Sequence, residues 1–131
     1  MPPYHGSCHC GAVRFTVESE ITDPYTCDCS LCRRRSATMA SVHESKLKIT
    51  EGEDKLSLYQ WNARIAKHYF CSVCGIYPFH KKRSTPDHYG VNLACLEDFH
   101  LAGQAVRKAD GLTMSVVADH SRPEWTGPRE R

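Results

Sequence analysis

Seven of the eight cysteines in this 131-residue chain fall into three short clusters. The clusters are Cys8-His9-Cys10, Cys27-Asp28-Cys29-Ser30-Leu31-Cys32 and Cys71-Ser72-Val73-Cys74. Cysteines two or three residues apart on a tight turn can aim two thiolates at one tetrahedral ion, which in turn holds the turn closed. Gly11 and Gly75 directly follow the outer clusters, where a glycine can take the positive φ that such a turn favours. The spacing therefore predicts metal sites, with zinc as the expected ion.

Other uses of cysteine fit the rest of the sequence less well. The first residues show no basic start followed by an apolar run, so we expect no secretory signal. Every apolar run is also far shorter than the roughly 20 residues that a membrane helix needs. We therefore expect a cytoplasmic protein, in which thiols are kept reduced and disulfides are rare. Clusters of buried, reduced thiols are the competing interpretation.

The three clusters differ in the kind of site that they predict. The two outer pairs together would supply the four sulfurs of a closed, structural site. Cys27, Cys29 and Cys32 supply three ligands, and three protein ligands with an open fourth position are typical of catalytic zinc. Spacing leaves two alternatives open. The middle cluster could share an ion with either outer pair. Alternatively, Cys95 or a histidine could supply its fourth ligand and make it a structural site. The other interpretation of Cys95 is a buried cysteine in a strand.

The ligand type of the middle cluster indicates what chemistry it favours. Three thiolates on Zn²⁺ leave a net charge near −1, so the ion would be a poor generator of hydroxide. It would be a good holder of a further thiol in its thiolate form. The middle cluster therefore predicts thiol activation rather than hydrolysis.

Apolar residues alternate with polar ones in several short stretches, which predicts a mostly β fold with little helix. The expected strands are 13–17, 47–50, 55–61, 66–70, 89–93 and 114–117, the second and third forming a hairpin around the polar turn 51–54. Short helical turns are conceivable at 30–35 and 96–99, and 80–87 is expected to be an exposed loop. The length predicts a single domain.

Three sequence segments carry a resemblance to a known family. The segments 6–15, 29–33 and 69–75 resemble, in the same order, the signature segments of the CENP-V/GFA family, and the resemblance covers most of residues 4–100. It implies a zinc-stapled β-tent of two small antiparallel sheets, with one zinc-binding domain over 1–121 and a flexible tail over 122–131. It also implies that Cys8, Cys10, Cys71 and Cys74 hold a structural zinc, and that Cys27, Cys29 and Cys32 hold a catalytic one. Two zinc ions per chain are then expected, the second site being the more easily emptied.

The family's activity is the condensation of glutathione with formaldehyde to S-hydroxymethylglutathione, formally a carbon–sulfur lyase reaction in reverse. The resemblance therefore implies that glutathione or another small thiol and a small aldehyde are the partners. Arg33 and Arg34, with the adjoining Arg35, are candidates to receive the glutathione carboxylates, and 81–83 is the second choice. An ordinary solvated basic turn explains both groups equally well. His80 and Asn92 are candidate supporting groups, although such residues in a small β domain usually make structural hydrogen bonds.

A non-catalytic zinc module is the alternative function: a thiol carrier, or a domain that binds protein or nucleic acid. Tracking a phosphate backbone needs a dense basic face. The formal net charge is only +2 and the pI is near 8.1, so we do not expect nucleic acid as a partner.

Overall fold

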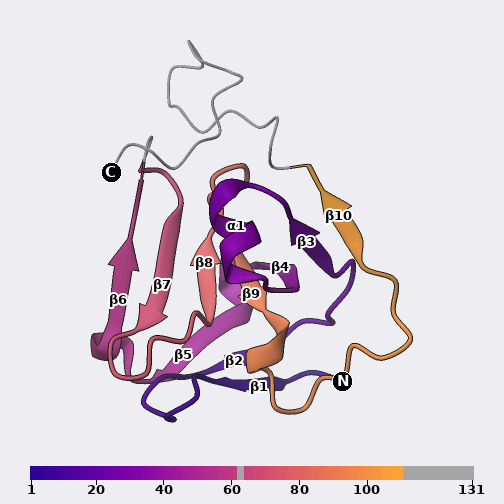
Figure 1. Ribbon diagram of the computed structural model, residues 1–131. Coiled ribbons are helices and arrows are strands. Elements are labelled where there is room, and N and C mark those ends of the chain that lie inside the picture. Colours follow the sequence, from indigo (N-terminus) through magenta and orange to yellow (C-terminus); the bar gives the residue numbers. More distant parts are fainter. Residues whose placement is uncertain (62–63, 111–131) are drawn as a thin grey trace.

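The computed structural model describes residues 1–61 and 64–110, and in this part of the chain it shows two β-sheets and one α-helix (Figure 1). The strands are β1 (Tyr4–Ser7), β2 (Arg14–Val17), β3 (Tyr25–Cys27), β4 (Met39–His43), β5 (Leu47–Glu51), β6 (Leu56–Tyr59), β7 (Lys67–Cys71), β8 (Phe79–Lys81), β9 (His88–Asn92) and β10 (Arg107–Ala109). The helix is α1 (Ser30–Arg35), and short 3-10 helices span Glu44–Lys46, Glu53–Lys55 and Leu93–Cys95. The predicted fold class, mostly β with little helix, is confirmed.

The strands are divided between a small and a large sheet. The three-stranded sheet has the order β1-β2-β5, and the seven-stranded sheet has the order β10-β3-β4-β9-β8-β7-β6. In Figure 1 the smaller sheet lies below the larger one, and α1 lies beside the middle strands of the larger sheet. Neighbouring strands are antiparallel as expected, except that β10 pairs parallel with β3.

The main core gathers apolar side chains from both sheets. Phe15 and Val17 alternate with exposed or partly buried neighbours on β2, and both pack into one cluster with Phe79 and Val91 of the larger sheet. The rings of Phe15 and Phe79 meet edge to face with their centroids 5.1 Å apart. Burying a side chain of this kind contributes about 1.5–3 kcal/mol. The alternation that predicted β2 thus also identifies the residues that hold the two sheets together.

The predicted hairpin between 47–50 and 55–61 is wrong, although both segments are strands. β5 pairs with β2 in the smaller sheet, whereas β6 pairs with β7 in the larger one. The chain changes sheets at Gly52, which has a φ of 76° and leads into the 3-10 helix Glu53–Lys55. A Cβ at Gly52 would lie 1.8 Å from the carbonyl oxygen of Ala12, so only glycine fits where the two segments approach. A turn signal shows where a strand ends and does not show with which strand it pairs.

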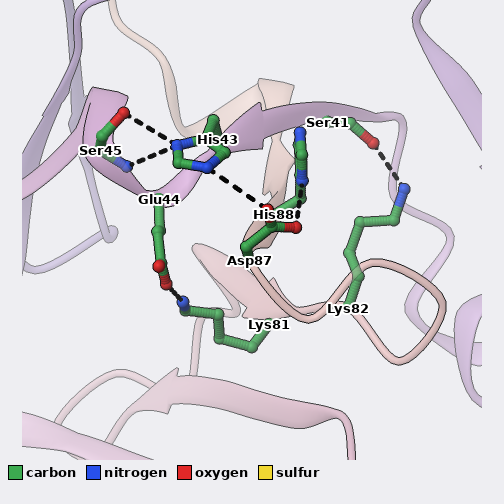
Figure 2. A network of polar contacts seen from close by, with 8 residues as sticks. All are labelled: Ser41, His43, Glu44, Ser45, Lys81, Lys82, Asp87 and His88. Atoms are coloured by element: carbon green, nitrogen blue, oxygen red, sulfur yellow. Dashed lines mark hydrogen bonds and ion pairs between the residues drawn. The ribbon is translucent and has the colours of Figure 1, made fainter.

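The other predicted elements have mixed outcomes. The strands near 13–17, 66–70 and 89–93 are confirmed, and the helical turn at 30–35 is α1. The segment 80–87 is not all loop, because its first two residues belong to β8, which pairs with β7 and β9. The remaining loop is held at its end by Asp87, which contacts His43 and His88 (Figure 2).

The predicted helical turn at 96–99 is also wrong, because the 3-10 helix lies just before it, at Leu93–Cys95. The Asn92 side chain starts that helix by accepting a hydrogen bond of 3.2 Å from the amide of Ala94. Cys95 is therefore buried in a 3-10 helix and not in a strand. The predicted strand 114–117, the tail 122–131 and the end of the predicted domain lie outside the described residues. None of the helices in the described part of the chain has the length and apolar character to cross a lipid bilayer.

Candidate metal centres

The first candidate metal centre joins the two sheets. The Sγ atoms of Cys8, Cys10, Cys71 and Cys74 all lie within 4.8 Å of one another. The first two cysteines lie in the loop between β1 and β2 of the smaller sheet, and Cys71 ends β7 of the larger sheet. Spacing left the grouping of the clusters open, and the structure brings the two outer clusters together.

The distances between these sulfurs fit a zinc ion. The Sγ atom of Cys10 lies 3.7 Å from that of Cys8 and 3.8 Å from that of Cys71. Four sulfurs arranged tetrahedrally at about 2.3 Å from Zn²⁺ would be separated by about 3.8 Å. The backbone amides of Val13 and Val73 also donate to the sulfurs of Cys8 and Cys71, over 3.3 and 3.4 Å. The site therefore has the spacing and the amide donors that suit four thiolates on one ion.

The two turns that carry these cysteines have the predicted backbone. Gly11 and Gly75 take φ values of 84° and 82°. The backbone amides of Cys10, in the first turn, and of Ile76, after the second, lower the pKa of the Cys74 thiol to about 6. A lowered pKa favours the thiolate form, which is the form that binds metal.

The second candidate centre consists of the Sγ atoms of Cys27, Cys29 and Cys32, which also lie within 4.8 Å of one another. Cys27 ends β3, and Cys29 is the N-cap of α1, its sulfur accepting a hydrogen bond of 3.3 Å from the amide of Cys32. Hydrogen bonds with Cys27 and Cys32 lower the pKa of Cys29, whereas hydrogen bonds with Cys29 and Cys32 raise the pKa of Cys27. The cluster thus holds one sulfur readily as thiolate and would gain from a cation that neutralises the others.

A fourth protein ligand for the second centre is not found among the described residues, and Cys95 is not near it. The sulfur of Cys95 lies 3.6 Å from the carbonyl oxygen of Tyr77 and belongs to the main core. Burial raises the pKa of Cys95 to about 11, so it stays a neutral thiol. Among the described residues, the second centre therefore offers three cysteine sulfurs.

Arg35 is the arginine that contacts the second centre. Its Nη2 donates to the sulfur of Cys32 over 3.3 Å, and its Nη1 lies 3.0 Å from Nδ1 of His68. The guanidinium carbon lies 3.9 Å from the ring centre of Tyr77. The Nε atom of Arg35 is buried and has no hydrogen-bond partner among the described residues. This arginine is thus fixed as a partly buried positive charge beside the three sulfurs.

Two histidines and a tyrosine form the layer behind Arg35. His68 stacks on His80 with the ring centroids 5.2 Å apart, and the hydroxyl of Tyr77 lies 2.6 Å from Nδ1 of His80. Burial lowers the pKa of His80 well below its ordinary value, and burial together with the charge of Arg35 lowers the pKa of His68 to about 4. Both rings are therefore neutral near pH 7. The candidate Asn92 instead donates to the carbonyl oxygen of Tyr77 over 2.8 Å, which is a structural role.

A cavity of about 460 Å³ adjoins the second centre, and the three cysteines form part of its wall. This volume falls in the range of about 300–1,000 Å³ that is usual for small-molecule sites. Apolar side chains line part of it: Leu31, Met39, Trp61, Ile65, Ala66 and Ala109. Basic side chains line another part: Arg64, Lys82, Arg83, Arg107 and Lys108. The cavity suits a small molecule that carries negative charge.

The structure places only some of the basic residues predicted from the sequence at the cavity. Arg33 and Arg34 are exposed and do not line the cavity, and Arg34 donates to the carbonyl oxygen of Ser30 over 2.9 Å. Figure 2 shows that Lys81 reaches Glu44, whereas Lys82 turns to Ser41, 2.5 Å from its Oγ.

The basic residues of β10 could not be predicted as part of this site. The parallel pairing of β10 with β3 places Arg107 opposite Tyr25. The Tyr25 ring lies 5.1 Å from the Lys82 amine and 5.3 Å from the Arg107 guanidinium carbon. Nothing in the spacing of these residues along the chain indicates that they meet, because only the sheet pairing brings them together.

Comparisons with known proteins give a consistent result. The family model described as glutathione-dependent formaldehyde-activating enzyme matches residues 3–110. A relative in Penicillium rubens is 25% identical over 89% of this chain and 64% of its own length. A relative in Emericella nidulans is 28% identical over 95% of this chain and 68% of its own length. A relative in Halomonas elongata is 35% identical over 53% of this chain and 50% of its own length. All three carry the name of the same family, and the matches span about one half to two thirds of these relatives.

A solved structure supports the fold independently of these names. A crystal structure of a Rhodobacter sphaeroides protein is 45% identical in sequence and superposes with a TM-score of 0.75. The match covers 80% of this chain and 99% of the other chain.

Proposed function

Because this chain belongs to the glutathione-dependent formaldehyde-activating enzyme family, we propose that it catalyses carbon–sulfur bond formation between a small thiol and a small aldehyde. Glutathione and formaldehyde are the first pair to test. The observation that carries the proposal is the placement of three clustered cysteine sulfurs in the wall of a ligand-sized cavity with no fourth protein ligand among the described residues.

In this proposal the two cysteine clusters hold two zinc ions with different roles. Cys8, Cys10, Cys71 and Cys74 would hold a structural ion, because four sulfurs within 4.8 Å of one another can supply all the ligands of a tetrahedral zinc. Cys27, Cys29 and Cys32 would hold the second ion. When bound there, zinc would supply a positive charge that favours the thiolate form of an incoming thiol.

The chain's own residues would bind and orient the thiol substrate. Lys82, Arg83 and Arg107 line the cavity and are placed to receive the carboxylates of glutathione, a role for which Arg33 and Arg34 are less well placed. The apolar side chains that line another part of the wall would limit the access of water to the sulfur. The guanidinium of Arg35 holds Cys32, which fixes the cluster against the cavity.

The reaction forms a C–S bond and an O–H bond, and it breaks the S–H bond of the thiol and the π bond of the carbonyl group. The thiol loses its proton to solvent, its sulfur bonds to the carbonyl carbon, and the electron pair of the C=O double bond moves to oxygen. The oxygen then takes up a proton to give the S-hydroxymethyl adduct. Holding both reactants in one cavity converts an encounter in solution into a reaction between positioned groups.

Exchange NMR of glutathione with formaldehyde tests this proposal, because the uncatalysed addition is fast and only acceleration over background counts. Protein with two zinc ions per chain is expected to accelerate the exchange, and Cys32→Ser is expected to abolish the acceleration while the protein stays folded. Cys95→Ser, a buried cysteine outside both clusters, is the matched control and should keep the activity. If the protein binds the thiol but does not accelerate the exchange, the enzyme proposal is wrong and the protein is a thiol carrier.

A further inference from the structure

One residue at the cavity, His68 on β7, has a tautomer that the structure determines. Its Nδ1 atom lies 3.0 Å from Nη1 of Arg35. A guanidinium group has only donors, so Nδ1 of His68 must accept this hydrogen bond. The single proton of the neutral ring is therefore on Nε2. Arg35 thus converts the other side of the ring into a hydrogen-bond donor.

The neutral state of His68 follows from the same contact. In a protonated ring both nitrogens carry a proton, and an Nδ1–H would then point at the cationic guanidinium of Arg35. His68 is also partly buried, and its pKa is lowered to about 4 by burial and by Arg35. The ring is therefore neutral under ordinary conditions, with one fixed N–H group.

The N–H group of His68 is available to a ligand. His68 lines the same cavity as the three cysteines, and none of the described residues makes a hydrogen bond to its Nε2 atom. The ring cannot turn freely, because it stacks on His80 and is held by Arg35 at Nδ1. Arg35 itself is held by Cys32 and by the Tyr77 ring. A single donor is thus fixed beside the sulfur cluster.

We propose that the Nε2–H group of His68 donates a hydrogen bond to the carbonyl oxygen of the aldehyde while the carbon–sulfur bond forms. This inference rests on the proposed function, and it names the residue that polarises the carbonyl group of the aldehyde. As sulfur bonds to carbon, the carbonyl oxygen gains negative charge, and a donor already in place lowers the barrier. A neutral imidazole can perform this role without giving up its proton, because a hydrogen bond suffices. The oxygen receives its final proton from water.

Arg35 is then a positioning residue. It touches no reacting atom in this scheme, and its two contacts tie the orientation of His68 to the position of Cys32. Replacing it with leucine frees Nδ1 of His68, so the ring can place its proton on either nitrogen.

The kinetic test compares two amides at position 68. In His68→Gln the amide nitrogen reaches about as far as Nε2 of histidine, whereas in His68→Asn it reaches only about as far as Nδ1. We expect His68→Asn to lose about 100-fold or more in kcat with little change in KM, as for removal of a single oxyanion donor. His68→Gln should recover at least a tenfold part of that loss. Equal activity of parent and His68→Asn, both holding two zinc ions per chain, would overturn the proposal.

A second measurement does not depend on turnover. The ¹⁵N shifts of the His68 ring, recorded with zinc bound, should show a protonated Nε2 and an unprotonated Nδ1 in the parent, and a mixture of tautomers in Arg35→Leu. A pre-equilibrated mixture of glutathione and formaldehyde, which contains the hydroxymethyl adduct, should shift the Nε2 resonance. S-methylglutathione, which lacks the hydroxyl group, should not shift it in the same way.

The two measurements separate failure of this inference from failure of the proposed function. An active parent whose His68 proton lies on Nδ1, or whose Nε2 responds equally to both ligands, would overturn the inference and leave the function standing. An inactive parent whose Nε2 still responds to the adduct alone would overturn the function and support the donor role in ligand binding. No response in an inactive parent would overturn both.

Discussion

Loss of one sulfur from the first cluster should unfold the domain, and Cys71→Ser is the sharpest way to remove it. Cys71 is 0% exposed, and its sulfur lies 3.8 Å from that of Cys10. The substitution replaces a soft thiolate by a hydroxyl at a fully buried ligand position. Structural zinc sites of this type contribute about 10–16 kcal/mol of apparent binding free energy. This binding free energy is as large as the whole free energy of unfolding of a typical domain, which is roughly 5–15 kcal/mol.

Cys95→Ser is the matched control for this substitution. Cys95 is also buried, at 7% exposure, but its sulfur belongs to neither cluster and lies 3.6 Å from the carbonyl oxygen of Tyr77. Placing a hydroxyl in an apolar site costs about 1–3 kcal/mol, and the nearby carbonyl offers it a partner. We expect a melting temperature lower by roughly 10 °C at most, with both zinc ions retained.

Circular dichroism melts and zinc content per chain, measured at one fixed zinc concentration, test the pair. Cys71→Ser is expected to hold at most one zinc ion and to show no cooperative melting transition. If Cys71→Ser melts like Cys95→Ser and still holds two ions, the first cluster is not a structural metal site. The argument from sulfur spacing would then be refuted.

Three further predictions concern the second centre and its surroundings. Gly90→Ala should lower the free energy of unfolding by about 2–3 kcal/mol in denaturant titrations, because the new Cβ would lie 2.3 Å from the Cε1 atom of buried His80. A variant as stable as the parent would contradict this close approach of Gly90 and His80. Because the folded-state pKa of His68 is about 4 and its ordinary value is 6.5, the unfolded chain binds more protons between these values. Stability should therefore fall as the pH is lowered from about 6.5 to 4, by up to about 1.4 kcal/mol per pH unit, and His68→Gln should lack that component in melts at several pH values. Lys82→Ala should raise the KM for glutathione about tenfold in the exchange assay, and Arg33→Ala should leave this KM unchanged. The reverse pattern would mean that residues of α1, and not the cavity lysine, bind the carboxylates of glutathione.

The cysteine clusters were the part of the site that the sequence could predict. Short spacings fix which cysteines share a turn, and glycines at positive φ complete two of those turns, so local chemistry was enough to identify the candidate ligands. The helical turn at 30–35 was predictable for the same reason. Its residues lie beside one another in the chain, and the i, i+3 spacing brings Arg35 back over Cys32.

The cavity could not be predicted, because it is made by pairings between distant segments. Arg107 reaches the site only because β10 adds to the edge of β3, and His68 meets His80 only because β7 pairs with β8. Alternation of apolar residues marks a strand without naming its partner. The same limitation produced the wrong hairpin, since β5 and β6 are neighbours in the chain that join different sheets.

The position of the first cluster in the chain sets an order of events during synthesis. Cys10 and Cys71 are 61 positions apart, so the cluster closes a long loop. All three strands of the smaller sheet precede Gly52, whereas Cys71 and Cys74 follow it. At about 5–20 residues per second, a ribosome needs several seconds to extend the chain from one half of the cluster to the other. For that interval Cys8 and Cys10 can offer only two of the four sulfurs, so a complete four-sulfur metal site can form only after Cys74 has been added.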